Sequence, residues 1–403
     1  MTLESRTDML QFRAEPIPDV GVGLVGLGRR GTEAVSRLPK VPGCHLAAVC
    51  DVRPEAAAAA SGVRAYTDYR ALCEDPAVDL VYICTDWGHH VPIALYAMDC
   101  GKHVAIEVPS AQTLDECWAL VKASERTRRH CTILENCCYD SFELAALEMA
   151  RRGAFGQLVH AEGAYHHNLE NRWGPDNMGW RLELNRSQRG DLYPTHGLGP
   201  ACQALGIHRG DRLATLVSMD TAPFNGPRHL KELTGSDPAG FQNGDLTMTM
   251  IRTQKGRTIL LQHDVMTPRP YDRGYQLVGT AGFAQKYPSE RVCLSADGAE
   301  RVYEGDELAS LLPGYRSPIL TPSIEALSKT VGGHDGMDFL MDYRVIYCLN
   351  HGLPLDMDVY DLAEWCCITE LSRISLENGS RPVEVPDFTC GSWNIIQGFS
   401  YAL

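Results

Sequence analysis

The sequence predicts a two-domain α/β protein, in which a doubly wound parallel sheet is followed by an α+β domain with a large, mostly antiparallel open sheet. Three observations lead to this prediction. The chain has 403 residues, which is too long for one ordinary hydrophobic core. Short apolar runs alternate with helix-like segments from residue 21 to about residue 140. Longer runs of alternating polarity follow residue 155.

The first domain is expected to carry parallel strands with helices on both faces. Thr113 and Glu116 have the spacing of a capping box and predict a helix that runs through Arg129. A further helix over residues 141–152 would leave this domain. We therefore divide the chain into a loose N-terminal arm (1–19), the first domain (20–140) and the second domain (141–403). The expected strands of the first domain are residues 21–28, 45–51, 78–85, 103–109 and 131–137.

The second domain is expected to contain longer strands. Two of them flank Lys255 and Gly256, and a turn at that point predicts an antiparallel pair. An exposed face of this sheet is a plausible surface for homo-oligomer formation. Residues 168–190 are expected to form a long polar loop. Helices return at residues 337–352 and 359–379, and the second ends on a glycine that suits a helix C-cap.

Composition excludes several classes of function. The net charge of -14 comes without a block of basic residues, so we expect no nucleic-acid partner. No apolar run approaches the roughly 18 residues that cross a bilayer, and residues 1–20 lack the order of a secretory signal. A cytoplasmic protein without a membrane partner is expected. The 15 cysteines form no C-x-x-C pair, so buried reduced thiols are expected and no metal site is predicted.

The string GLGRRG (26–31) fits the pattern G-x-G-x-x-G through Gly26, Gly28 and Gly31. It follows an apolar strand and precedes a helix, where it supplies a tight turn and a helix N-terminus that holds a pyrophosphate. The next strand ends in Asp51, 20 residues after Gly31, where an acid binds a ribose 2′-hydroxyl. The first domain is therefore predicted to be a Rossmann domain that binds NAD. NADP is disfavoured because Asp51 would repel its 2′-phosphate, although Arg53 nearby would attract it.

Ligands of such sheets lie at the carboxyl ends of the strands. Polar and aromatic residues follow three of the predicted strands there, and each has a structural alternative, such as a capping histidine. Their shared position favours a binding site. These residues are Trp87, His89, His90, Glu107 and Asn136.

The string DLYPTHGLGP (191–200) predicts a helix start, with Pro194 suited to the first turn. Tyr193 and His196 are three residues apart, so their side chains can share one face and could exchange the proton of a substrate hydroxyl. A packed tyrosine and a capping histidine are the alternative.

Three further residues are candidates for substrate binding. Arg181 belongs to the polar loop, Tyr165 ends the first strand of the second domain, and Tyr271 stands in PRPYDR (268–273). Arginines that anchor a loop or make a subunit contact, and buried structural tyrosines, are the alternatives.

From about residue 20 to residue 388 the chain resembles the Gfo/Idh/MocA oxidoreductases, and more narrowly the family 109 glycoside hydrolases, the NAD-dependent α-N-acetylgalactosaminidases. The strings that carry the resemblance are GLGRRG (26–31), WGHH (87–90), EVPS (107–110), ENCCYD (135–140), HAEGAYHH (160–167), GDLYPTHGLGP (190–200) and HDVMTPRPYDR (263–273).

The resemblance implies two sets of contacts. The residues implied to contact NAD are Arg30, Gly31, Asp51, Trp87, His90, Glu107, Val108 and Asn136. The residues implied to contact the sugar are Tyr165, Arg181, Tyr193, Pro194, Thr195, His196 and Tyr271. The substrate implied is a small glycoside or glycan terminus such as an N-acetylgalactosaminide.

The resemblance also implies a redox-neutral mechanism. The sugar loses hydride from C3 to NAD, which acidifies the hydrogen on C2; a base removes that proton and the aglycone leaves from C1. Water adds to the enone, and C3 regains its hydride. NAD is then recycled in every turnover and should stay tightly bound. His196 and Tyr193 are the expected catalytic residues, without a decision on which proton each transfers.

Two other functions compete with the hydrolase. The first is an NAD-dependent sugar dehydrogenase that releases NADH. Ordinary members of the superfamily carry a lysine where this chain has Val108, and its absence argues against a simple dehydrogenase. The second is a noncatalytic NAD-sensing protein, which the intact Tyr193, His196 and Tyr271 disfavour.

Overall fold

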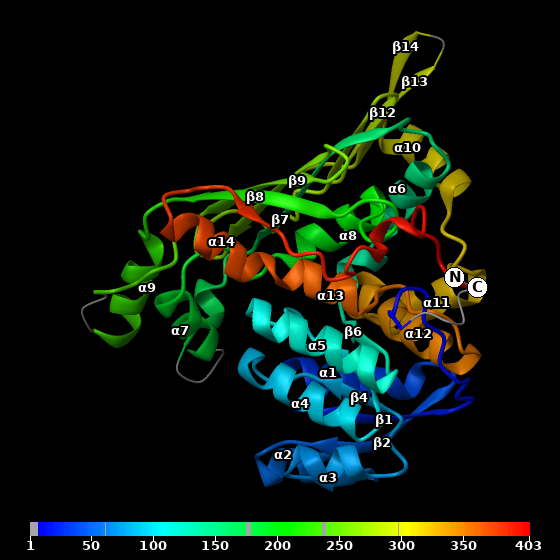
Figure 1. The fold of residues 1–403 in the computed structure, drawn as a ribbon, viewed down its shortest axis with the longest axis vertical. Helices are drawn as coiled ribbons and strands as arrows, with labels where there is room; N and C mark the ends of the chain where they lie inside the picture. Colours follow the sequence, from blue (N-terminus) through cyan, green and yellow to red (C-terminus); the bar gives the residue numbers. More distant parts are fainter. Residues whose placement is uncertain (1–6, 61, 175–178, 236–238, 297) are drawn as a thin grey trace.

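The computed structural model describes residues 7–60, 62–174, 179–235, 239–296 and 298–403. Its strands form two sheets, which lie at opposite ends of the molecule in Figure 1. The first sheet contains β1 (Val20–Val25), β2 (Cys44–Cys50), β3 (Arg64–Tyr66), β4 (Leu80–Ile83), β5 (His103–Ile106) and β6 (Cys131–Ile133). The second contains β7 (Leu158–His166), β8 (Leu213–Asp220), β9 (Thr247–Thr253), β10 (Thr258–Asp264), β11 (Gln276–Gly279), β12 (Gly282–Gln285), β13 (Arg291–Ala296), β14 (Ala299–Glu304) and β15 (Val383–Glu384).

The first sheet is parallel throughout, in the order β3-β2-β1-β4-β5-β6. This order confirms the predicted doubly wound sheet. The short edge strand β3 was not predicted. The predicted strands were too long at their carboxyl ends, because residues 26–28, 107–109 and 134–135 belong to loops and residues 136–137 begin a short 3-10 helix (Asn136–Tyr139).

Helices cover this sheet and connect its strands. They are α1 (Arg29–Arg37), α2 (Pro54–Ala59), α3 (Tyr69–Glu74), α4 (Trp87–Asp99) and α5 (Leu114–Thr127), and α6 (Ser141–Arg151) follows β6. Helix α5 begins with the predicted capping box: the Glu116 N–H donates to the Thr113 hydroxyl, and the Glu116 carboxylate accepts from the Thr113 N–H. Helix α6 begins at Ser141, as predicted, with Asp140 as its N-cap.

The second sheet has the order β14-β13-β12-β11-β7-β10-β9-β8-β15. Strands β9 and β10 pair antiparallel across Lys255 and Gly256, which confirms the predicted turn. Only β7 and β10 pair in parallel among the described strands of this sheet. The sheet is therefore mostly antiparallel, as the sequence predicted.

The remaining helices lie around and below the second sheet. They are α7 (Gly179–Ser187), α8 (Thr195–Leu205), α9 (Asn225–Thr234), α10 (Gly305–Leu311), α11 (Pro322–Val331), α12 (Met337–His351), α13 (Val359–Cys366) and α14 (Ile368–Glu377). Helix α8 packs on strand β7 and helix α14 packs on strand β8, while α13 packs on α5 and β6 (Figure 1). The C-terminal helices therefore fill the space between the two sheets.

Two expectations about helices and loops require correction. The predicted loop 168–190 contains helix α7, whose Arg181 and Leu182 are buried; residues 175–178 of that loop lie outside the described residues. The predicted helix over 359–379 divides into α13 and α14 at Cys367. Gly379 follows α14 with a φ of 73°, as its predicted role at a C-cap requires.

The N-terminal arm is not loose where it is described. Residues 1–6 lie outside the described residues, but Met9 and Leu10 are buried in the core. The Met9 N–H donates to the Tyr360 hydroxyl at 3.0 Å, and the Ile17 N–H donates to the Leu349 carbonyl. Apolar side chains therefore anchor the arm to the C-terminal helices.

Two further predictions concern the cysteines and the membrane. All 15 cysteines are free and most are buried, as expected for reduced thiols. Within the described ranges, no helix is long and apolar enough to cross a membrane.

Candidate active site

The glycine-rich loop lies between β1 and α1, where the three glycines have different tasks. Gly26 has a φ of 94°, which a residue with a side chain rarely adopts. A Cβ on Gly31 would lie 1.8 Å from the Gly26 carbonyl oxygen, so Gly31 allows helix and loop to approach. A Cβ on Gly28 would meet no protein atom within 4 Å. Helix α1 has no capping side chain and no acid in its first turn, so its N-H groups remain available to an anion.

Asp51 follows β2 and contacts this loop. Its Oδ2 accepts a hydrogen bond of 2.7 Å from the Leu27 N–H, and Oδ1 accepts from the Arg53 backbone N–H at 2.9 Å. Burial opposes ionisation, but the hydrogen bonds from Arg53 and Leu27 outweigh it and lower the pKa of Asp51 below its ordinary value. Asp51 therefore remains an anion beside the glycine loop, as the predicted ribose contact requires.

A cluster of charged and amide side chains lies at the other end of the loop. Arg30 donates to Glu107 at 2.9 Å and to Asp338 at 3.0 Å. Asn136 also donates to Asp338, at 2.7 Å. The predicted cofactor residues Arg30, Glu107 and Asn136 are thus brought together, and Asp338 from α12 joins them.

The other residues predicted at the ends of the third and fourth strands lie in different environments. Trp87 and Val108 are buried. His90 is buried as well, and its two ring nitrogens lie 3.0 Å from the Pro109 carbonyl oxygen and 3.1 Å from that of Thr85. His90 therefore ties two loops together, and its contact to NAD remains a prediction. His89 is exposed and pairs with Asp86, the N-cap of α4.

An aromatic cluster connects these strand ends with the second domain. Tyr165 at the end of β7 stacks on Tyr193 with centroids 4.3 Å apart, and His196 on α8 lies 4.9 Å from the Tyr193 ring. Trp87 lies 5.9 Å from Tyr193 and 5.2 Å from Trp180 of α7. Tyr193 and His196 share one site, as their spacing predicted.

Arg181 lies within this cluster. Its guanidinium carbon is 4.5 Å from the centroid of Tyr193, 5.0 Å from that of Trp87 and 5.8 Å from that of Tyr165. The side chain is buried, and no carboxylate in the described ranges pairs with it. Cation–π contacts hold the guanidinium in place while its N–H groups remain available to a neutral acceptor.

His196 has a buried carboxylate partner. Its Nδ1 lies 2.7 Å from Oε1 of Glu135, a side chain with no solvent exposure that follows β6. Burial alone would raise the pKa of Glu135, but His196 and neighbouring hydrogen bonds lower it, so the carboxylate stays ionised. An ionised acceptor places the imidazole proton on Nδ1 and leaves the lone pair on Nε2. This is the arrangement of an oriented general base.

Three titratable side chains near His196 are uncharged near pH 7. Burial lowers the pKa of His167 to about 4 and that of His263 to about 3, so both are neutral near pH 7. Burial raises the pKa of Tyr193 well above its ordinary value, so its phenol remains protonated. Among these groups, only His196 combines an imidazole with a carboxylate partner in the described structure.

The remaining predicted sugar contacts border the same cluster. Pro194 is the N-cap residue of α8, and Thr195 begins that helix; both are buried. Tyr271 is 42% exposed and lies 5.1 Å from His167, whose Nδ1 is 3.0 Å from the Tyr165 hydroxyl. Contacts of these residues with a sugar remain predictions.

Sequence reasoning missed four residues of the site: Glu135, Asp338, His167 and Trp180. Glu135 had a signal, since it lies near the carboxyl end of the predicted strand 131–137, in ENCCYD, directly before the predicted Asn136. Asp338 had none, because it is 202 positions from Asn136 in the sequence and meets it only in the fold.

Among the residues that the structure describes, two groups have side chains of the kinds that bind metals. Glu135, Cys137 and His196 form one, and His208, Asp358 and Asp361 form the other. Burial raises the pKa of the Cys137 thiol well above its ordinary value, so the thiolate that a metal needs is disfavoured. Arg209 already pairs with Asp361 at 2.7 Å in the second group. Neither group requires a metal to account for its geometry.

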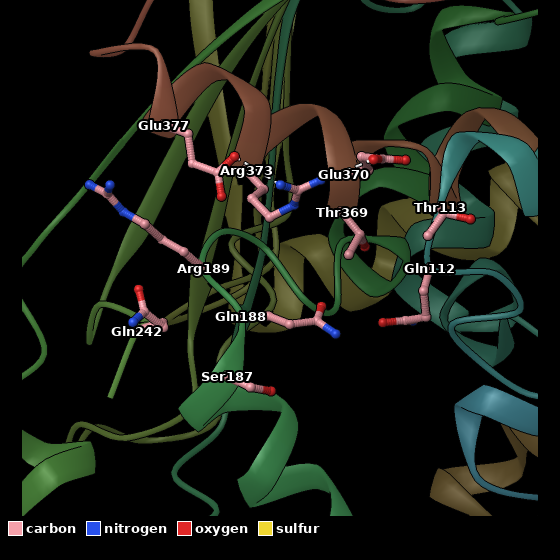
Figure 2. Close-up of a pocket in the computed structure, with 10 residues that line it drawn as sticks. All are labelled: Gln112, Thr113, Ser187, Gln188, Arg189, Gln242, Thr369, Glu370, Arg373 and Glu377. Carbon is pink, nitrogen blue, oxygen red and sulfur yellow. Dashed lines mark hydrogen bonds and ion pairs between the residues drawn. The ribbon is translucent and has the colours of Figure 1, made fainter. Parts of the chain in front are cut away.

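A polar cavity of about 430 Å³ lies beside the site, where α14 and the end of α7 approach the start of α5 (Figure 2). It contains none of the predicted site residues. Its arginines are paired, Arg189 with Asp220 at 2.6 Å and Arg373 with Glu370 at 3.0 Å and Glu377 at 2.8 Å, so neither arginine is left to bind an anion. The lining residues are Gln112, Thr113, Ser187, Gln188, Arg189, Gln242, Thr369, Glu370, Arg373 and Glu377.

Comparison with known proteins assigns both parts of the chain to known families. Residues 139–395 match the model of the glycosyl hydrolase 109 C-terminal domain, and residues 20–134 match the oxidoreductase family with an NAD-binding Rossmann fold. A glycosyl hydrolase family 109 protein of Bacteroides thetaiotaomicron is 51% identical, over 99% of this chain and 91% of the relative. One of Porphyromonas gingivalis is 52% identical, over 98% and 90%.

The chain belongs to glycoside hydrolase family 109. As a member of this family it is an NAD-dependent enzyme, and its first domain is an NAD-binding Rossmann domain. The glycine loop, the uncapped start of α1 and the anionic Asp51 all fit that cofactor.

Solved structures share the fold of this family 109 chain. A levoglucosan dehydrogenase in complex with NADH and levoglucosan has a TM-score of 0.70 and 19% identity, over 92% of this chain and 100% of that one. An NAD-binding oxidoreductase of Klebsiella pneumoniae has a TM-score of 0.71 and 19% identity, with the same coverage. The fold is therefore that of Gfo/Idh/MocA oxidoreductases.

Proposed function

We propose that this enzyme is an α-N-acetylgalactosaminidase that cleaves its substrate by transient oxidation at C3. The observation that carries the proposal is the pair of His196 and Glu135, which presents an oriented base inside an aromatic cluster next to the cofactor loops. Membership of family 109 supports a glycoside substrate. Bound NAD would supply the reversible removal of hydride from C3.

His196 is the proposed base for the hydrogen on C2. A ketone at C3 acidifies that hydrogen, and Nε2 of His196 carries the lone pair that can accept it because Nδ1 is held by Glu135. The ionised Glu135 stabilises the imidazolium that forms. Loss of the C2 proton drives the electron pair toward C1 and expels the aglycone.

Tyr193 is the proposed hydrogen-bond donor to the oxygen on C3. Burial keeps its phenol protonated, so it serves as a donor rather than as a phenolate base. Removal of the C2 proton places negative charge on that oxygen, and a donor already in position stabilises the charge in a buried site. In this division of roles His196 takes the C2 proton and Tyr193 donates to the oxygen on C3, while the proton that the C3 hydroxyl loses with the hydride passes to solvent.

Arg181 is the proposed contact for the acetamido group at C2. Its guanidinium is buried and held over three rings, and no carboxylate of the described residues pairs with it. A neutral carbonyl oxygen is a suitable acceptor, since it satisfies the N–H groups without adding a second charge. The surrounding aromatic rings can lie against the apolar face of a sugar.

A cofactor that returns its hydride in each turnover gains nothing by leaving. We therefore expect NAD to copurify with the protein. A sugar dehydrogenase, by contrast, must release NADH. Val108 in place of the usual lysine supports the hydrolase over this alternative.

The test is to incubate the purified protein with p-nitrophenyl α-N-acetylgalactosaminide and its β anomer and to follow nitrophenol at about 405 nm and NADH at about 340 nm together. Release of nitrophenol without net NADH is the expected result. Accumulation of NADH from a free sugar without cleavage would identify a dehydrogenase instead. Silence at both wavelengths would reject this substrate for the enzyme.

A further inference from the structure

Asp338 is a buried carboxylate near the start of α12, in the second domain, and it lies against the cofactor loops of the first. Its side chain is 1% exposed. Oδ2 accepts from Arg30 Nη1 at 3.0 Å, and Oδ1 accepts from Asn136 Nδ2 at 2.7 Å. His334 Nδ1 lies 2.9 Å from Oδ2. One carboxylate thus binds two residues that are predicted to contact NAD.

The charges around Asp338 favour its ionised form. Burial alone would raise the pKa of Asp338, but hydrogen bonds and charge from His334 and Arg30 lower it far below its ordinary value. Arg30 also pairs with Glu107 at 2.8 Å. Removal of one partner would leave a buried charge without compensation. The ion pairs and hydrogen bonds of this network therefore hold the side chains in a fixed geometry.

The turn before α12 is built to bring His334 onto this carboxylate. All five residues of GGHDG (332–336) have positive φ, including 45° at His334 and 58° at Asp335. Non-glycine residues rarely adopt this region and persist in it only where the surroundings impose it. A Cβ on Gly333 would lie 2.8 Å from the Asp338 Cβ, so this glycine permits the close approach.

A second carboxylate on the same helix shares Arg37 with Asp338, whose Oδ2 lies 3.6 Å from Arg37 Nη1, but its other partners differ. Asp342 is one turn further along α12 and is also buried. It accepts from Arg37 Nε at 2.6 Å and from the Tyr82 hydroxyl at 3.0 Å. Neither Arg30 nor Asn136 donates to it in the described structure. Asp342 therefore joins the two domains without touching the predicted cofactor residues.

We propose that Asp338 is a positioning residue for the cofactor, supplied to the NAD site by the second domain. It fixes Arg30 and Asn136 in the orientation that meets the dinucleotide. NAD affinity then depends on contact between the domains at α12, and not only on the Rossmann loop. The proposal rests on the predicted contacts of Arg30 and Asn136 with NAD and is independent of the sugar that the enzyme cleaves.

The experiment compares Asp338→Asn with the matched control Asp342→Asn in the full-length protein. NAD that copurifies is released with acid and quantified, and the dissociation constant of NAD for the stripped protein is measured by calorimetry. We expect Asp338→Asn to weaken NAD binding by about tenfold or more, because charge-assisted hydrogen bonds orient Arg30 and Asn136. Asp342→Asn should lower the melting temperature and leave NAD binding within about twofold of wild type.

Two results would overturn the proposal. One is an Asp338→Asn variant that binds NAD within twofold of wild type. The other is an equal loss of NAD in both variants, which would indicate a general effect of domain contact. If Asp338→Asn does not fold, His334→Ala replaces it: we expect NAD binding about threefold weaker, and unchanged binding in that variant would reject the proposal.

Discussion

At the scale of single residues, two buried carboxylates near Tyr193 and His196 have pKa values shifted in opposite directions. Glu135 is fully buried, yet the charge of His196 and several hydrogen bonds lower its pKa, so it stays ionised beside the proposed base. Asp191 is buried just before Tyr193 and has no cationic partner among the described residues, so burial raises its pKa to about 7. The partner, rather than the depth of burial, decides the charge state.

Glu135→Gln should lower kcat for nitrophenyl release by about 10²-fold or more, because the amide keeps the shape of the side chain but no longer stabilises the imidazolium. Bound NAD should be unchanged. Glu364→Gln is the matched control, since Glu364 is another buried glutamate that pairs with a histidine, His208, at 3.2 Å and away from the site. That control should lose stability while kcat remains near wild type.

His196→Ala should abolish turnover with NAD still bound, and the double variant with Glu135→Gln should be no worse than His196→Ala alone, because residues that act as a unit are not additive. Steady-state kinetics of the three variants provides the comparison. Substantial cleavage by His196→Ala would remove His196 from the mechanism.

Asp191→Asn should reduce the dependence of stability on pH. The pKa of Asp191 rises from an ordinary value of 3.8 to about 7 in the folded protein, so between these values the unfolded state binds fewer protons than the folded state. The free energy of unfolding of the wild type therefore falls as pH rises from 4 to 7, and part of this fall should vanish in the variant. Urea unfolding at pH 5 and pH 8 measures the free energy of unfolding of both proteins. An equal change of this free energy with pH in wild type and variant would contradict the pKa shift.

At the scale of elements, the turn from β1 to α1 assigns each glycine a separate role. Gly31 is enclosed by the Gly26 carbonyl, whereas Gly28 faces open space and has a φ of -71° that alanine can adopt. The turn therefore combines a packing requirement with a ligand requirement within four residues. At Gly31 the fold requires the absence of a side chain. At Gly28 the predicted pyrophosphate requires it.

Gly28→Ala should leave the melting temperature of the NAD-free protein nearly unchanged and weaken NAD binding by about tenfold or more, because its methyl group would occupy the path of the pyrophosphate. Gly31→Ala is the comparison and should lower the melting temperature of the NAD-free protein by several degrees, since its Cβ would lie 1.8 Å from a backbone oxygen. Thermal melts and NAD titrations of both variants measure the melting temperature and the NAD affinity. If Gly28→Ala binds NAD normally, the cofactor does not cross this turn.

At the scale of the whole molecule, the second sheet has one face packed by helices and one face open. Strand β9 alternates between buried and exposed residues along its length. Met248 and Met250 are 40% and 42% exposed, and Met219 on the neighbouring β8 is 61% exposed beside Met248. Exposed methionines on a broad sheet favour burial against a second copy of the chain.

Met248→Lys combined with Met250→Lys should shift the protein toward monomer, since two buried ammonium groups would oppose a sheet-to-sheet interface. Light scattering behind size-exclusion chromatography measures the mass. Val52→Lys, an 85% exposed valine in the first domain, is the control and should keep the wild-type mass. A wild-type protein that is monomeric at all concentrations would contradict the predicted interface.

The elements that the sequence determined are those with local causes. Periodicity predicted the parallel sheet, the β9–β10 turn and helix α6, and the Thr113 capping box predicted the start of α5. The glycine loop and Asp51 were found because motif, strand end and acid follow one another within 26 residues of the chain. Such signals need only neighbouring residues, so they can be read without a fold.

The tertiary structure decided what joins distant segments. Helix α7 has weak periodicity, and its Arg181 is placed by the rings of Tyr193, Trp87 and Tyr165 rather than by its own sequence. The pairing of Glu135 with His196 spans 61 positions. Asp338 reaches Arg30 across 308 positions, and a lone aspartate in a helix gives no sign of that partner. Charge states follow from burial and partners, and both exist only once the chain is folded.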